Sequence, residues 1–162
     1  MKKIILTVGM GVALLVASSL QAKEKSVTLS SKSYKEVVEV LENGEKKTVL
    51  KEAKKVIPGD VVVYKNSITN HTKTSVKDMV LNNAIPKHTQ YVADSAKCES
   101  DCEIFFSVDN GESFKKPDEL MVKIGEKQRL ALPKEYTNVR WILTASLEAK
   151  SVTDVSFKTK LQ

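Results

Sequence analysis

The clearest alternation of apolar and polar residues lies in the last part of the chain. Over residues 154–161 the odd positions carry Val, Phe, Thr and Leu, and the even positions carry Asp, Ser and Lys. Residues 139–144 alternate in the same way, which places Trp141, the only tryptophan, on one side of an extended segment. Alternation with one polar side is typical of an antiparallel sheet that faces solvent on that side. We therefore predict two β-strands here, with Trp141 and Phe157 in the core.

A longer β-rich run, residues 61–70, is predicted to be the central strand of the fold. It follows Pro58 and Gly59, and because proline fixes φ and glycine permits a positive φ, this pair predicts a tight turn. The apolar side of the run, which includes Tyr64, is interrupted by Asn66. A buried asparagine needs hydrogen-bond partners. We expect Asn66 either to pair with a neighbouring backbone group or to mark a β-bulge.

The segment before this strand contains a hairpin signal. Asn43 and Gly44 both accept the positive φ of a type I′ turn. Residues 46–52, after the turn, have β character, whereas residues 34–41, before it, fit either a strand or a short helix. The turn favours the strand, so we predict a β-hairpin. The alternative is a partly mobile arm that precedes the main domain.

Several shorter runs with β character follow, and turns separate them. Asn110 and Gly111 predict a second hairpin turn, residues 121–124 form a short apolar run, and residues 130–136 are predicted to be a loop. Many short strands between turns favour a sandwich or barrel over an α/β fold. We predict an all-β, antiparallel β-sandwich. The other predicted strands cover residues 76–81, 89–92 and 103–108.

The N-terminus has the three parts of a secretory signal peptide: two lysines, an apolar run over residues 4–16, and a small-residue exit over residues 18–22. We predict cleavage after Ala22. The alternatives are cleavage after Ser19 and a retained transmembrane anchor, although the apolar run is shorter than the roughly 20 residues that a spanning helix needs. We therefore predict an exported protein of the periplasm or cell surface, without a stable membrane span after cleavage.

Removal of residues 1–22 leaves 140 residues, which is the size of one domain. We divide them into a strand or hairpin segment over residues 23–54 and a sandwich domain over residues 55–162. The formal net charge is +6, and it falls to +4 without the two lysines of the signal peptide. Charges of both signs alternate along the chain. This predicts a solvated surface and no nucleic-acid partner; the alternative is a patch for an anionic partner.

Cys98 and Cys102 are the only cysteines. In an oxidising compartment two cysteines at this spacing predict a structural disulfide, here one that pins the tip of a hairpin. The spacing differs from Cys-x-x-Cys, which argues against a redox site. No second pair of cysteines or histidines completes four metal ligands. We predict neither a metal nor a cofactor.

The order of several motifs resembles the bacterial conserved-repeat domain, the family called domain of unknown function number eleven. The similar stretches are IPGDVVVY at 57–64, ITN at 68–70, VKDMVLNNAIP at 76–86, TQYV at 89–92, FFSVDNG at 105–111, YTNVRW at 136–141 and VSF at 155–157. The resemblance covers residues 55–161. It implies an immunoglobulin-like sandwich of exported and cell-surface proteins, with no catalytic residues to carry over.

Two positions depart from the family's pattern. Members carry a Leu-x-Pro-Gly turn before the last strand, whereas Leu147 is followed here by Glu, Ala, Lys and Ser over residues 148–151. This turn must therefore be built from other residues. Asn66 stands where members often have an apolar residue or threonine.

No catalytic constellation is present in the sequence. His71 and His88, the only histidines, lie in predicted loops, and there is neither a nucleophile elbow nor a phosphate-binding glycine loop. We predict a non-enzymatic structural or protein-binding module of the bacterial cell envelope. Its partner would be another envelope or surface protein, bound through a sheet face, an edge strand or loops. The alternative is a periplasmic small-ligand binding protein with a pocket between the sheets or at the loops.

Overall fold

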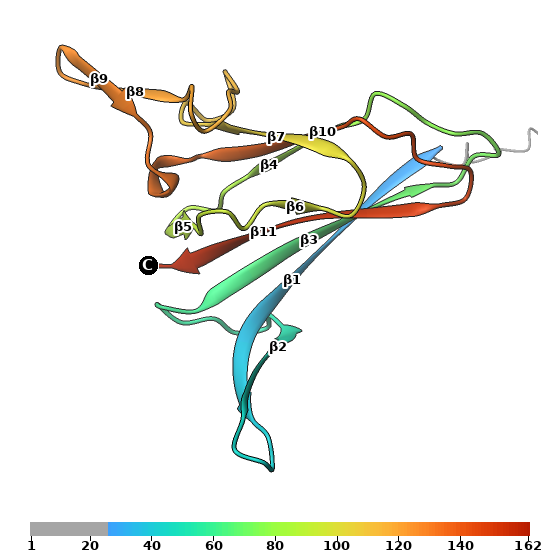
Figure 1. The fold of residues 1–162 in the computed structure, drawn as a ribbon, viewed down its shortest axis with the longest axis horizontal. Helices are drawn as coiled ribbons and strands as arrows, with labels where there is room; N and C mark the ends of the chain where they lie inside the picture. Colours follow the sequence, from blue (N-terminus) through green and yellow to red (C-terminus); the bar gives the residue numbers. More distant parts are fainter. Residues whose placement is uncertain (1–25) are drawn as a thin grey trace, which may run out of the picture.

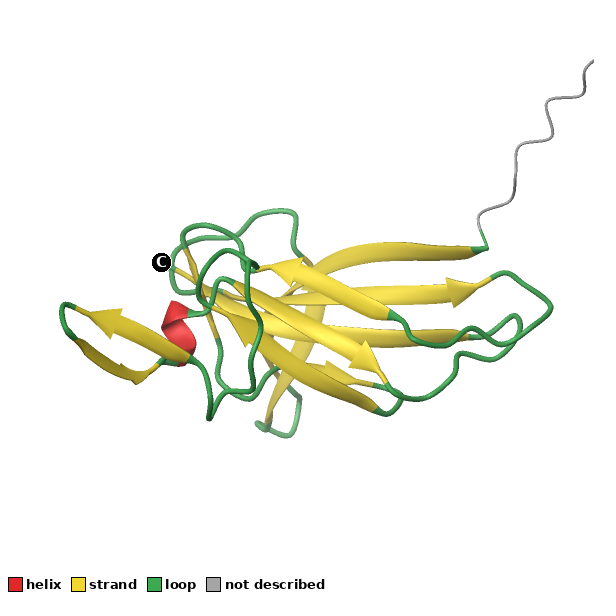
Figure 2. Ribbon diagram, turned by 90° about the horizontal axis from the view of Figure 1, so that it is seen from above, coloured by secondary structure: helices red, strands yellow, loops and turns green. Residues whose placement is uncertain are grey.

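The computed structural model describes residues 26–162, which form an antiparallel β-sandwich (Figures 1 and 2). Two sheets pack against each other, and a 3-10 helix, η1 (Pro133–Glu135), lies just before the penultimate strand, β10 (Asn138–Leu143). The predicted all-β, antiparallel β-sandwich is confirmed. The predicted signal peptide, with its cleavage after Ala22, lies outside the described residues.

The larger sheet contains six antiparallel strands. Their order is β2-β1-β3-β11-β5, and β6 also pairs with β11. The bounds are β1 (Val27–Val40), β2 (Lys46–Glu52), β3 (Val61–Asn70), β5 (Thr89–Tyr91), β6 (Lys97–Cys98) and β11 (Val152–Leu161).

The smaller sheet contains three antiparallel strands in the order β4-β10-β7. A separate two-stranded hairpin, β8–β9, projects from the body of the sandwich (Figure 1). The remaining bounds are β4 (Val80–Ala84), β7 (Cys102–Ser107), β8 (Met121–Ile124) and β9 (Lys127–Leu130).

The core lies between the two sheets and is rich in aromatic side chains. Trp141 on β10 and Phe157 on β11 are fully buried, and Tyr64 on β3 stacks on Phe157 with ring centroids 5.0 Å apart. These three residues were predicted to share the interior, and the structure confirms this. A second aromatic group near η1 brings the Phe106 and Tyr136 rings to 4.5 Å. Burial of such large apolar surfaces is the main stabilising contribution to the fold.

The turn before β3 is formed as predicted. The N–H of Asp60 donates to the Ile57 carbonyl at 3.0 Å, and Gly59 between them has a φ of +94°. The Asp60 carboxylate accepts the N–H of Ile57 at 2.8 Å and pairs with Lys35 Nζ at 2.7 Å. β3 then pairs with β1 on one side and β11 on the other, so it is a central strand.

The predicted N-terminal hairpin is confirmed, and β1 serves both the hairpin and the sandwich. Residues 27–35 of β1 pair with β3, and residues 34–40 pair with β2. The turn differs from the predicted type I′ form because only Gly44 has a positive φ, +82°. The hydrogen bonds of Leu41 to Gly44 and Glu45 close a short loop with a glycine bulge, another common hairpin connection.

Asn66 follows neither of the two predicted arrangements. The β3 register is unbroken at Asn66, which lies opposite Ser31 on β1 and Val155 on β11, so there is no bulge. Its partner is a side chain and not backbone: the Ser31 hydroxyl donates to Asn66 Oδ1 at 2.6 Å. Asn66 is 1% exposed, and its Nδ2 has no hydrogen-bond partner among the described residues.

Two predicted segments are shifted or shortened. The strand predicted over residues 76–81 begins only at Val80, because Asp78 has a φ of +56° that a strand does not permit. The second hairpin turn has a positive φ at both Asn110 and Gly111, but a single bridge between Phe106 and Lys115 replaces the returning strand.

The predicted loop over residues 130–136 is instead the end of β9 followed by η1. Residues 127–130 have no alternation of apolar and polar positions, so β9 was not predicted. It forms because Gly125 turns the chain back onto β8, with Met121 opposite Leu130. Arg129 pairs with Glu135 at 2.6 Å and fixes η1 beside the hairpin.

The turn before the last strand, β11, contains no Pro-Gly pair, unlike the corresponding turn of the family that the sequence resembles. Lys150 adopts a φ of +60°, which glycine adopts more readily. The Ser151 N–H and hydroxyl both donate to the Glu148 carbonyl, at 3.2 and 2.7 Å. Lys150 Nζ also donates to the His71 carbonyl at 2.6 Å. These hydrogen bonds hold the lysine in the left-handed conformation.

Candidate functional site

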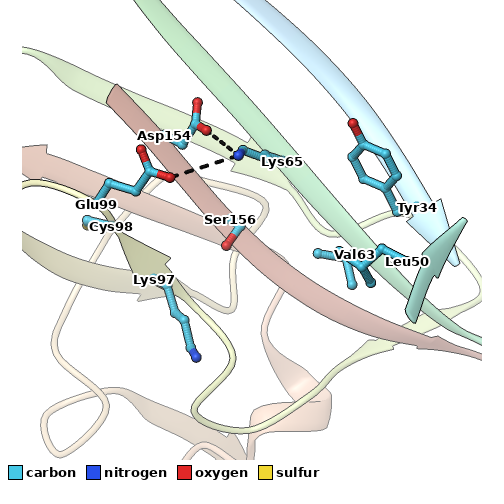
Figure 3. A pocket seen from close by; sticks show the side chains of 9 residues that line it. All are labelled: Tyr34, Leu50, Val63, Lys65, Lys97, Cys98, Glu99, Asp154 and Ser156. Atoms are coloured by element: carbon cyan, nitrogen blue, oxygen red, sulfur yellow. Dashed lines mark ion pairs between the residues drawn. The ribbon is translucent and has the colours of Figure 1, made fainter. Parts of the chain in front are cut away.

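A cleft of about 270 Å³ lies on the outer face of the six-stranded sheet, the face turned away from the three-stranded sheet (Figure 3). We call it the outer cleft. Its lining combines charged or polar side chains with apolar ones. It consists of Tyr34, Leu50, Val63, Lys65, Lys97, Cys98, Glu99, Asp154 and Ser156.

Strand alternation places these side chains. On β3 the core-facing residues include Tyr64 and Asn66, so Val63 and Lys65 point to the outer face. Lys65 lies opposite Ser156 of β11. The floor of the cleft is therefore formed by two neighbouring central strands, β3 and β11.

The walls come from the strands on either side. Tyr34 of β1 lies opposite Val63, and Lys97 of the short strand β6 lies opposite Ser156. Leu50 of β2 enters from the projecting hairpin, as Figure 3 shows. Strands far apart in the sequence thus meet at one place on the sheet.

An ion pair between Lys65 and Asp154 crosses the cleft (Figure 3). Glu99 Oε1 lies 3.9 Å from Lys65 Nζ. The hydrogen bond that Lys65 donates to the Asp154 carboxylate raises the pKa of Lys65. Burial acts to raise the pKa of Asp154, but the hydrogen bond and charge of Lys65 outweigh it and the pKa is lowered. Both groups are therefore charged at neutral pH.

Two polar groups of the outer cleft are left without partners among the described residues. Asp154 Oδ1 is buried and accepts no hydrogen bond. The Lys97 ammonium takes part in none of the ion pairs of residues 26–162. The cleft thus has one cation without an ion-pair partner among the described residues, Lys97, while the positive charge of Lys65 is compensated by Asp154.

The apolar side of the cleft continues onto the projecting hairpin β1–β2. Leu50 lies opposite Glu36, and Val38 and Val40 follow on the same face of β1 because alternate residues share a face. The exposed fractions of Leu50, Val38 and Val40 are 52%, 60% and 66%. We call these three side chains the hairpin apolar face. In Figure 1 the hairpin extends beyond the rest of the sheet, so solvent surrounds this face.

The predicted disulfide between Cys98 and Cys102 is present, but it does not pin a hairpin tip. Cys98 ends β6, which pairs with β11 in the six-stranded sheet, whereas Cys102 begins β7, which pairs with β10 in the three-stranded sheet. The disulfide therefore closes the crossover between the sheets. Cys98 also lines the outer cleft, so the crosslink fixes one wall of the cleft to the smaller sheet.

The opposite side of the sandwich is open. β4 is the outermost strand of the three-stranded sheet, and residues 27–32 of β1 pair with β3 only. An apolar notch of about 280 Å³ lies between these two strands. It is lined by Val27, Leu29, Ile68, Met79, Val80 and Leu81.

Both histidines lie at the surface. His71 and His88 are exposed, and His71 Nε2 lies 2.8 Å from the Thr28 hydroxyl. Within residues 26–162, no group of three or more His, Cys, Asp or Glu side chains is placed to hold a metal ion. None of the helical structure in this part of the chain has the length and apolar character needed to cross a membrane.

Comparisons with known proteins leave the family open. No protein-family model matches the chain, and no curated protein matches its sequence. Among solved structures it is similar to the "Putative membrane anchored protein from Corynebacterium diphtheriae", with 17% sequence identity and a TM-score of 0.49. The match covers 86% of this chain and 28% of that protein. Similarity of this degree carries no inference about function.

The outer cleft was not predicted from the sequence. The polar side of β11 was predicted to face solvent, and this side supplies Asp154 and Ser156. The sequence does not show the order of the strands in the larger sheet. This order places Lys97 and Tyr34 on either side of the polar residues of β11. The local signal that remained was Lys65, the one charged residue of β3.

Proposed function

We propose that the chain is a non-enzymatic, exported, immunoglobulin-like module of the bacterial cell envelope that binds another protein through the hairpin apolar face. Membership of the conserved-repeat family is part of this proposal, and the order of the motifs between residues 57 and 157 supports it. The observation that carries the proposed binding role is the exposure of Leu50, Val38 and Val40 on one side of a projecting hairpin.

Exposure of three neighbouring apolar side chains on a protruding element is unfavourable in water. Full burial of a valine or leucine side chain contributes about 1.5–3 kcal/mol. On the reverse side of the same hairpin Val37 lies opposite Val49, both are only partly exposed, and Lys51 and Glu39 form an ion pair at 2.8 Å. The most exposed valines of the hairpin, Val38 and Val40, lie on the other face together with Leu50, and this makes that face the candidate binding surface.

The surroundings of the hairpin apolar face match the usual anatomy of a protein interface. Its inner end meets the outer cleft at Leu50 and Tyr34, and beyond them lie Lys65 and Lys97. Glu36, on the same face, pairs with Lys158 at 2.5 Å. An apolar centre with a polar rim is typical of protein–protein interfaces. The charged rim then gives orientation and the valines give affinity.

The test is a pull-down from envelope extract of the source bacterium with the mature protein as bait. The double variant Val38→Ser/Val40→Ser is compared with the wild type. We expect at least a tenfold loss of a specific co-purifying protein, because each buried valine contributes enough to change Kd about tenfold.

A matched control is available on the other projecting hairpin. Ile124 and Leu130 are 58% and 48% exposed on β8–β9. The variant Ile124→Ser/Leu130→Ser removes similar apolar surface at another place, and we expect it to retain the partner. Equal capture by all three baits would disprove binding through the hairpin apolar face.

The alternative of a periplasmic small-ligand binding protein is favoured by one observation, the outer cleft itself. The Lys97 ammonium, which takes part in no ion pair of the described residues, suits a small molecule that carries an anionic group. A thermal-shift screen with amino acids and similar zwitterions tests this. A stabilising ligand whose effect disappears in Lys97→Ala, together with no captured protein, would favour the alternative.

A further inference from the structure

The open side of the sandwich is where the two sheets differ in extent. The smaller sheet has three strands and ends at β4, while the larger sheet continues past β3 to β1. The core-facing side chain of Leu29 on β1 is consequently 51% exposed. The smaller sheet is thus one strand too narrow to cover the inner face of the larger sheet.

The backbone of β4 has unpaired groups on this open side. The N–H of Leu143 donates to the Met79 carbonyl at 2.9 Å, and the N–H of Ile85 donates to the Thr137 carbonyl at 2.8 Å. In an antiparallel ladder, residues bond to one neighbour at every second position. The odd-numbered residues of this segment therefore bond to β10. The even-numbered ones, Val80, Asn82 and Ala84, direct their N–H and C=O groups to the free edge.

This edge lacks the protection that free edges usually carry. Charged residues, prolines and bulges commonly blunt an exposed strand edge. Residues 80–84 include none of them, although 28% of the chain is charged. Residues 27–31 of β1, on the other side of the notch, are also uncharged. An uncharged edge above an apolar notch is a template for an added strand.

We propose that the free edge of β4 binds an extended segment of a partner polypeptide, which adds a fourth strand to the smaller sheet and covers Val27 and Leu29. This concerns a second surface and is independent of the hairpin apolar face. The backbone groups of β4 specify an extended chain. The notch of about 280 Å³ specifies apolar side chains at alternate positions of that chain.

The charged residues beside the two ends of β4 indicate which charges the partner segment carries at its own ends. They also argue against a second copy of this chain as the partner. Lys77 and Lys87 lie five residues before and five residues after Asn82, and neither takes part in an ion pair of the described residues. Antiparallel pairing of two β4 edges centred on Asn82 would bring Lys77 of one copy to Lys87 of the other. Asp78 offsets part of the charge at one end only. A partner with an uncharged centre and acidic ends is complementary at both ends.

The test selects binders from a random seven-residue peptide library displayed on phage, with the wild-type mature protein as target. We expect enriched sequences with apolar residues at alternate positions and Asp or Glu toward the ends. Hydrogen exchange of the protein with an enriched peptide should slow at Val80, Asn82 and Ala84. Enriched peptides without this alternation, or protection confined to other strands, would overturn the proposal, and so would a selection that yields no binder.

Two variants separate edge pairing from other binding. Ala84→Pro removes one N–H at the free edge and leaves the hydrogen bonds to β10, and proline is tolerated on an edge strand in this orientation. Val80→Lys places a charge at the same edge by changing a side chain that is 54% exposed. We expect each to weaken the selected peptides at least tenfold. If Ala84→Pro has an altered circular dichroism spectrum, Val80→Lys decides alone.

Two further measurements assign the result. The hairpin variant Val38→Ser/Val40→Ser should bind the selected peptides like the wild type. The proposal for the hairpin apolar face and the proposal for the β4 edge can therefore be confirmed or disproved independently. Sedimentation of the wild type at increasing concentration should show a monomer. A dimer that Val80→Lys dissociates would overturn the proposed partner and assign the edge to a second copy of this chain.

Discussion

Trp141 of the smaller sheet and Phe157 of the larger sheet meet in the core with their ring centroids 5.9 Å apart. Both side chains are fully buried, and Tyr64 of the neighbouring strand β3 stacks on Phe157. The two sheets are therefore joined by direct aromatic contact at their centres.

This contact predicts a large effect of truncation. We expect Trp141→Ala to lower the free energy of unfolding by about 3–5 kcal/mol, because it leaves a cavity at the sheet interface. Trp141→Phe should cost less, since the indole N–H makes no hydrogen bond and its loss removes none. Chemical unfolding followed by fluorescence of the tyrosines measures both variants. As a control, Leu132→Ala at a 45% exposed position should change stability by less than about 0.5 kcal/mol.

The disulfide predicts a redox-dependent stability. We expect Cys98→Ser/Cys102→Ser to lose about 2 kcal/mol relative to the oxidised wild type, the value that chain entropy gives for a loop of this length. Urea unfolding with and without a thiol reductant measures the difference. The wild type in reductant should match the double variant, whose own stability should not respond to the reductant. A double variant as stable as the oxidised protein would show that the crossover holds without its crosslink.

The hydrogen bond between the exposed Ser31 and the buried Asn66 predicts a non-additive result. Ser31→Ala should lower the free energy of unfolding by about 1 kcal/mol, because it removes the donor to Asn66 Oδ1. Adding Asn66→Leu to this variant should restore the loss or more, since it removes both unpaired polar atoms of a residue that is 1% exposed. A double-mutant cycle by chemical unfolding measures the coupling. Additive losses would contradict the inferred pairing.

Glu135 predicts a pH dependence at the acidic end of the range. Hydrogen bonds from Arg129 and from the Leu132 N–H lower the pKa of Glu135 from 4.5 to about 2. A carboxyl whose pKa is depressed in the folded state stabilises the fold above its unfolded pKa, and this contribution is lost as the pH falls. We expect the melting temperature of the wild type to fall between about pH 4.5 and pH 2. Glu135→Gln should show a smaller fall over that interval, and an identical profile would contradict the assignment.

The strands with regular alternation were predicted from the sequence because their signal is local. β10 and β11 alternate apolar and polar positions, and β3 is rich in β-branched residues although Asn66 interrupts its apolar side, so the partners that bury these strands need not be known. β9 lacks this pattern, and it becomes a strand only because the turn at Gly125 brings it against β8. The start of β4 was predicted too early because the left-handed conformation of Asp78 leaves no mark in its residue type.

The candidate site was less predictable than the fold because it depends on strand order. Cys98 and Cys102 were predicted to pair, but that they join two sheets follows only from the partners of β6 and β7. In the same way, Lys97 and Tyr34 reach the outer cleft from different strands, although these two residues lie more than sixty positions apart in the sequence. No pattern among neighbouring residues of the sequence indicates that two such distant strands contribute to the same cleft.

The crossover at Cys98 and Cys102 lies on the opposite side of the sandwich from β1 and β4. There the chain passes from β6 to β7 through residues 99–101, and the disulfide tightens this already short connection. On the side of β1 and β4 the backbone connection from β3 to β4 runs through the longer segment of residues 71–79. The spacing of the two sheets is therefore most narrowly restricted at the crossover. Reduction of the two sulfurs would loosen that restriction without releasing the strands, because the backbone still joins them.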